Sequence, residues 1–140
     1  GWLTQIGTIG TSPAGTKSIS IRSSGIILSS GEIDVVSDQR DKNLIDCLTP
    51  KVSLDAISKL NPLHFSWKPE TNKGEYVIAG FFAQEVAKAI PEAVSIYKGE
   101  KRDDEHTLNY NVLTAYTVSA IQALIDEVKE LKDRLKKLEG

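Results

Sequence analysis

The most regular hydrophobic pattern in the chain lies near its C-terminal end. From Asn111 to Glu139 the sequence holds no Gly or Pro. Apolar residues recur there in alternating steps of 3 and 4, which is the a/d repeat of a coiled coil. The members of this seam are Ile121, Leu124, Val128, Leu131, Leu135 and Leu138. The pattern predicts a helix over 111–139 that packs along the seam against parallel copies of itself.

Charges beside the seam favour the parallel arrangement. Glu127 and Lys132, and then Arg134 and Glu139, occupy g and e positions five residues apart with opposite sign. Such pairs meet across chains in a parallel coiled coil, whereas an antiparallel partner makes no use of them. The alternative is an amphipathic helix packed on its own domain. Ile and Val at a with Leu at d favour two-chain coiled coils in isolated peptides. The seam therefore indicates oligomerisation without deciding the number of chains.

Residues 37–110 show shorter periods of both kinds. One predicted helix begins at a Ser53 cap, carries Leu54, Ile57 and Leu60 on one face, and ends before Pro62. A second runs over 83–90 and stops before Pro91. Apolar runs bounded by Gly, Pro and Asn predict strands at 63–67, 76–82, 93–97 and 107–110, with a turn over 68–75 between the first two.

The first 36 residues differ from the rest in composition. They contain six Gly, many Ser and Thr, and only four charged side chains. The pieces 18–21 and 26–28 read as strands between glycine turns, and we interpret the segment as the end of a β-rich body. The fold class predicted is therefore α+β, with a β-rich N-terminal segment, a small mixed body and a long C-terminal helix that forms a parallel coiled coil.

Composition and charge exclude several classes of function. The 17 basic and 19 acidic residues give a net charge of −2, which argues against a protein that neutralises nucleic-acid phosphates. The single Cys47 excludes an internal disulfide and a multi-cysteine zinc site, and is best explained as a small buried residue. No apolar run is long enough to predict a membrane span. His and carboxylate residues lack metal-ligand spacing, so neither a metal nor a cofactor is expected.

Ser37 and Lys42 are separated by five residues, as a Ser-Lys catalytic dyad could be. With 13 Ser and 13 Lys in the chain, about one such pair is expected by chance. Ser12 and Lys17 have the same spacing, so the spacing alone indicates nothing. The context of the first pair, Ser-Asp-x-Arg-x-Lys, is what distinguishes it.

That context resembles the C-terminal intramolecular chaperone domains of bacteriophage tailspikes and tail fibres, the self-processing family of the endosialidase type. Further landmarks of the family follow in the same order over 37–138. They are the strand Leu60–Lys68, the segments Ala79–Val86 and Pro91–Val94, and Leu108–Tyr110 ahead of the long helix.

The resemblance implies a homotrimer in which this domain guides assembly of a fibre and is then cut off. The cleaved bond would be Val36–Ser37, with Ser37 as nucleophile and Lys42 as general base in a single-turnover serine endopeptidase. Residues 1–36 would be the released fibre end, and 37–140 the chaperone. A serine hydroxyl needs a base, and lysine is one only where burial or a nearby cation lowers its pKa from about 10.4.

Other residues receive supporting roles from the same resemblance. Arg40 could supply the cation, while Asp38 and Arg40 could instead hold the turn or pair across protomers. Gln84 and Glu85 would line the site and orient Lys42 or a water. The alternative for this pair is a solvated helix face.

The expected partners are two further copies of the chain and the upstream fibre body, with no nucleic acid or membrane. Assembly would take place in the host cytoplasm, the fibre would enter the virion tail, and the chaperone would be released. Two other functions stay open: a permanent trimerisation cap without proteolysis, and the same domain in a membrane-tethered transcription factor. The Gly/Ser-rich segment before Ser37 favours a viral fibre over the latter.

Overall fold

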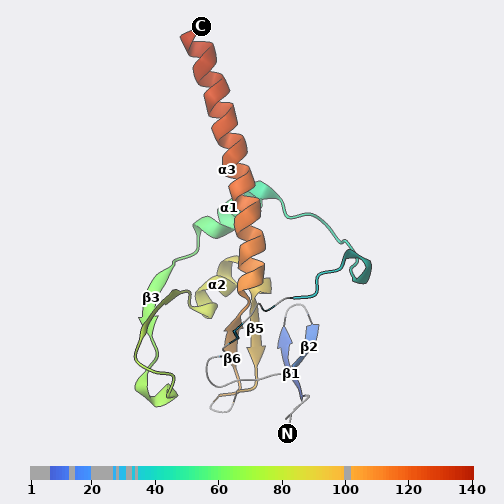
Figure 1. The fold of residues 1–140 in the computed structure, drawn as a ribbon, viewed down its shortest axis with the longest axis vertical. Coiled ribbons are helices and arrows are strands. Elements are labelled where there is room, and N and C mark those ends of the chain that lie inside the picture. Colours follow the sequence, from blue (N-terminus) through green and yellow to red (C-terminus); the bar gives the residue numbers. More distant parts are fainter. Residues whose placement is uncertain are drawn as a thin grey trace.

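The structure is a computed structural model that describes residues 7–12, 15–19, 27, 29–30, 33, 35–99 and 102–140 (Figure 1). The strands are β1 (Gly7–Ser12), β2 (Gly15–Ile19), β3 (Leu63–Ser66), β4 (Val77–Gly80), β5 (Val94–Tyr97) and β6 (Glu105–Leu108). The α-helices are α1 (Pro50–Ser58), α2 (Ala83–Ala89) and α3 (Tyr110–Glu139), and the 3₁₀ helices are η1 (Gln39–Asp41), η2 (Pro69–Thr71) and η3 (Pro91–Ala93). The α+β class predicted from the sequence is confirmed.

The strands form two antiparallel sheets. One has the order β2-β1-β5-β6, and the other is the hairpin β3-β4, with Leu63 opposite Gly80 and Ser66 opposite Val77. The hairpin turn uses the left-handed backbone at Asn72 (φ 54°) and Gly74 (φ 89°), residue types that tolerate a positive φ. The turn residues in the sequence therefore predicted this hairpin correctly.

The core lies where α1, α2, η3, β5 and the start of α3 meet. Its buried apolar side chains are Ala56, Val86, Ile90, Ala93, Val94 and Leu113. The backbone N–H of Asn109 donates to the carbonyl of Ala93 (2.7 Å), which ties the start of α3 to η3. Because the core is small, the folded body offers little apolar burial of its own.

Helix α3 is the dominant element of the fold. It begins at an Asn109 cap, whose side-chain oxygen accepts from the N–H of Asn111 (3.0 Å), and it projects far beyond the rest of the chain (Figure 1). It packs on α1, and the buried residues of the two helices include the small side chains Ser119, Ala120 and Ala123 of α3 and Ser53 and Ala56 of α1. The predicted helix over 111–139 is confirmed to within one residue, and its second half contacts no other described element.

The structure corrects one helix start. Helix α1 begins at Pro50, with Thr49 as its N-cap residue, so Ser53 lies one turn inside the helix and is buried. Proline is well suited to the first helical turn, where its missing N–H costs nothing, and it defines the start more strongly than the Ser53 hydroxyl. The predicted face of Leu54, Ile57 and Leu60 is only half-buried.

The strand predictions are correct in number for 37–110 and differ at their ends. Strand β6 lies two residues earlier than predicted because Asn109 already caps α3. In the N-terminal segment, Ser18 and Ile19 belong to β2. Residues 20–21 of the same predicted piece, and residues 26 and 28 of the second piece, lie outside the described residues.

Candidate functional site

A single turn of 3₁₀ helix brings the predicted catalytic residues together. Asp38 caps η1 at its N-terminal end and Lys42 follows its C-terminal end, where the Lys42 N–H donates to the carbonyl of Gln39 (3.2 Å). Ser37 lies just before the N-cap of this short turn and Lys42 lies at its C-cap, so the turn brings the two residues close together. The Lys42 Nζ donates a hydrogen bond to the Ser37 Oγ.

An ion pair within the same turn fixes its shape. The Asp38 carboxylate accepts from the backbone N–H of Arg40 (2.8 Å) and from the Arg40 Nη2 (2.6 Å). The side-chain and then the backbone hydrogen bond from Arg40 hold the pKa of the Asp38 carboxyl below its usual 3.8. The guanidinium charge is therefore compensated by Asp38 in the single chain, and the pair acts on the turn itself.

The residues on both sides of the Val36–Ser37 bond are exposed in the single chain. The Val36 side chain is 85% exposed, and Ser37 and Lys42 are exposed as well. The segment 42–49 that follows η1 is extended and exposed throughout, including Leu44 and Ile45. Cys47 belongs to this segment, so the expectation that it is buried is wrong. No helical or strand period marks 42–49, which is why sequence reasoning missed this exposed arm.

Gln84 and Glu85 do not reach the dyad within one chain. Both lie on α2 and are exposed, and Glu85 pairs with Lys88 on the same helix (3.0 Å). Figure 1 shows η1, in teal, and α2, in yellow, on opposite sides of α3. The single chain therefore unites Ser37, Asp38, Arg40 and Lys42, and leaves Gln84 and Glu85 apart from them.

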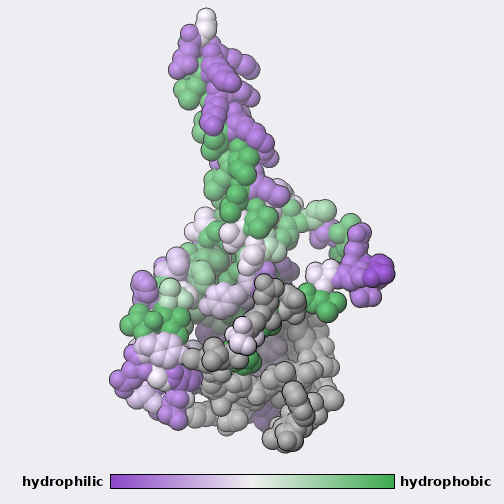
Figure 2. Space-filling view, in the orientation of Figure 1, coloured by the Kyte–Doolittle hydropathy of each residue, from purple (hydrophilic) through white to green (hydrophobic). Residues whose placement is uncertain are grey.

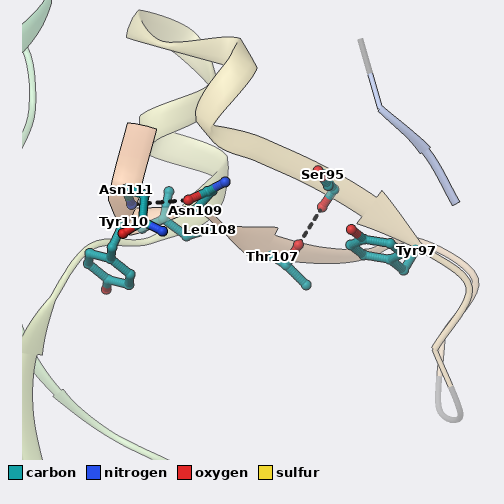
Figure 3. Close-up of a pocket in the computed structure, with 7 residues that line it drawn as sticks. All are labelled: Ser95, Tyr97, Thr107, Leu108, Asn109, Tyr110 and Asn111. Atoms are coloured by element: carbon teal, nitrogen blue, oxygen red, sulfur yellow. Dashed lines mark hydrogen bonds between the residues drawn. The ribbon is translucent and has the colours of Figure 1, made fainter. Parts of the chain in front are cut away.

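A pocket of about 380 Å³ lies beside β5, β6 and the start of α3. Figure 3 shows its lining, in which the Thr107 hydroxyl donates to the carbonyl of Ser95 (3.2 Å). The lining residues are Ser95, Tyr97, Thr107, Leu108, Asn109, Tyr110 and Asn111. None of them is a carboxylate, lysine or histidine that could activate a hydroxyl, so the pocket offers no second catalytic pair.

The described part of the chain shows neither a metal-ligand cluster nor a membrane-spanning helix. Among these residues, no three or more His, Cys, Asp or Glu side chains gather as metal ligands would. No described helix combines the length and the apolar character that crossing a bilayer requires.

The seam of α3 is a second candidate surface. Its six residues are between 46% and 83% exposed in the single chain. Figure 2 shows apolar side chains running up one side of α3 beside charged ones. Such a continuous exposed apolar stripe marks a surface that a partner covers.

Comparisons with known proteins find relatives for the part of the chain that contains this turn. Residues 37–95 match the model of a peptidase family described as "Chaperone of endosialidase". The long tail fiber protein Gp37 of Salmonella phage S16 is 42% identical over 60 residues, which are 43% of this chain. The match covers only 8% of the length of that fibre protein. Residues 37–95 therefore resemble the chaperone of endosialidase family, and the resemblance indicated by the motifs is confirmed over this part of the chain.

Proposed function

We propose that this chain is the self-cleaving chaperone end of a phage tail fibre. Residues 37–140 assemble three chains in parallel, and the trimer guides folding of the upstream fibre body that ends at Val36. The domain then cuts the Val36–Ser37 bond once and leaves the fibre. The fibre is afterwards held by its barrier to unfolding, because the domain that guided its folding has gone.

The contact between Lys42 and Ser37 is the observation that carries the proteolytic part. It joins the Nζ and Oγ atoms across η1, next to the bond that would be cut. In the structure the ammonium donates; in catalysis the neutral amine accepts the hydroxyl proton along the same line. The Asp38–Arg40 pair acts here as a positioning element, since it holds the turn that sets this contact.

The reaction follows from these atoms. The Ser37 Oγ attacks the carbonyl carbon of Val36 as its proton passes to Lys42. The C–N bond breaks, the Ser37 nitrogen takes the proton from Lys42, and Val36 remains as an ester on Oγ. Water, deprotonated by Lys42, then attacks the ester. The products are the Val36 carboxylate and a chain that begins with Ser37 and has regained its hydroxyl.

The trimeric assembly is supported by the second half of α3. Its seam residues have no partner among the described residues of the chain, and Ile125 at an e position adds to the apolar stripe with 48% exposure. An apolar residue at an e position makes the apolar stripe wider than the a and d positions alone. A wider stripe is suited to a coiled coil of more than two chains. The opposite charges at g and e support a parallel register.

Assembly and cleavage are coupled in this proposal by burial. Both members of the dyad are exposed in the single chain, and a solvated lysine ammonium is a poor base. The site therefore needs a covering surface that the other chains supply. Gln84 and Glu85, which lie away from the dyad in one chain, would reach it from a neighbouring copy.

Denaturing electrophoresis of the purified chain tests the proteolytic function. We expect fragments of 36 and 104 residues from the unmodified chain, and one intact band from Ser37→Ala and from Lys42→Ala. Ser30→Ala and Lys51→Ala, which change exposed residues of the same types outside the dyad, should cleave normally. A single intact band from every variant would instead indicate a permanent trimerisation cap.

A further inference from the structure

The larger sheet joins strands from both sides of the proposed cleavage bond. Strands β2 and β1 precede Val36, whereas β5 and β6 follow Ser37. Strand β1 pairs antiparallel with β5, with Thr11 opposite Ile96. A cut at Val36–Ser37 would break the covalent link between the two halves of this sheet and leave their backbone pairing in place.

The β5 edge is a preformed site for an extended strand. Its other edge is occupied by β6, from Val94 opposite Leu108 to Tyr97 opposite Glu105. Val94 and Ser95 are buried, and Val94 belongs to the core of the downstream domain, which anchors the strand there. A sheet edge of this kind presents unpaired N–H and C=O groups unless a further strand covers it.

The strand that covers this edge has a distinct chemistry. Strand β1 reads Gly-Thr-Ile-Gly-Thr-Ser, without a charged residue, and its other edge pairs antiparallel with β2. Its register with β2 shifts between Thr8 and Thr11, which marks a bulge. Backbone pairing of an uncharged Gly/Thr strand needs little side-chain recognition, so it suits a chaperone whose client is a repetitive β-rich chain.

We propose that the β5 edge is the client-binding surface of the domain and that it retains the fibre end after cleavage. This inference rests on the proposed function and names the partner of the domain: the Gly/Thr strand upstream of the cut. Cleavage and release are then two separate steps. The first breaks the peptide bond, and the second requires β1 to separate from β5. The single pairing position, Thr11 opposite Ile96, makes that contact short enough to be released.

The test separates retention from self-cleavage. The Ser37→Ala chain is used, with the recognition sequence of a site-specific protease replacing residues 43–48 of the exposed arm, so that the added protease makes the cut. Gel filtration under native conditions then reports whether the two fragments elute together. We expect co-elution of the fragments from the chain with Thr11 intact.

Thr11→Pro is the decisive variant, because Thr11 is the β1 residue opposite Ile96 and proline is not tolerated in an inner strand such as β1. It should shorten the lifetime of the fragment complex roughly tenfold, as expected for a lost backbone hydrogen bond. Ser30→Pro, outside the strands, should leave the lifetime unchanged. Immediate separation of the unmodified fragments, or equal retention with Thr11→Pro, would overturn the inference. Neither result depends on whether the unmodified chain cuts itself.

Discussion

Shortening Leu131 to alanine should weaken the trimer strongly while leaving each chain folded. Leu131 is a d residue in the middle of the seam, and 55% of its surface is exposed in the single chain. It contacts no residue of the buried core, which ends on α3 at Ala123. Alanine is the best helix former, so Leu131→Ala removes the seam contact without weakening α3.

The size of the effect follows from that exposure. Burying a whole leucine side chain contributes about 2–3 kcal/mol, and roughly half of that remains to be gained on assembly. Each chain therefore loses about 1–1.5 kcal/mol, and a trimer loses roughly 3–4.5 kcal/mol. Since about 1.4 kcal/mol corresponds to a tenfold change, the association constant of the trimer should fall by about 10²–10³. A cavity left in the seam would add to this loss.

Sedimentation equilibrium in the Ser37→Ala background measures the association without interference from cleavage. Glu130→Ala, one position earlier and facing away from the seam at a c position, is the matched control and should associate like the parent chain. The reasoning is refuted if Leu131→Ala and Glu130→Ala associate equally, or if the parent chain sediments as a monomer throughout.

Three further predictions concern the body and the turn. Ile90→Ala should destabilise the chain by about 3 kcal/mol in urea unfolding because Ile90 is 0% exposed, whereas Ile45→Ala, at an 89% exposed position, should change stability by less than about 0.5 kcal/mol; equal effects would contradict the assigned core. Ser119→Ala should raise the unfolding free energy by about 1 kcal/mol, since the buried Ser119 hydroxyl has no hydrogen-bond partner among the residues that the structure describes. A loss of stability would show that the hydroxyl is satisfied. The Asp38 carboxyl should titrate below 3.8 in a carbon-detected NMR titration, and its pKa should return towards that value in Arg40→Ala. Because the pKa is lowered in the folded state, the pair stabilises the fold at pH values above the unfolded pKa, and this stabilisation is lost as the pH falls through the folded pKa. An unchanged titration in Arg40→Ala would contradict the pairing.

Local patterns predicted the elements whose causes are local. The absence of Gly and Pro from 111–139 and the heptad repeat were sufficient for α3. Pro91 ended α2 where predicted, and the Asn and Gly residues of 68–75 placed the hairpin. The start of α1 failed because two helix-start signals competed, and the fixed φ of Pro50 prevailed over the Ser53 hydroxyl.

What sequence reasoning could not reach depends on distant contacts. The pairing of β1 with β5 joins Thr11 to Ile96 at one position, and no periodicity marks such a contact. The spacing of Ser37 and Lys42 was uninformative by itself. A capping Asp38 followed by a short turn could have suggested that the two side chains meet, since one 3₁₀ turn brings its flanking residues close. The number of chains depends on surfaces that only assembly brings together.

The coupling of assembly to cleavage is the central claim, and the rate of cleavage at different chain concentrations tests it most directly. The chain would be synthesised in a cell-free system at graded levels, and the fragment that begins at Ser37 would be quantified by mass spectrometry over time. Trimer-dependent cleavage predicts a fraction cut per unit time that rises steeply with concentration and levels off once trimers predominate. A rate that is the same at every concentration, or a cut at any bond other than Val36–Ser37, would contradict it.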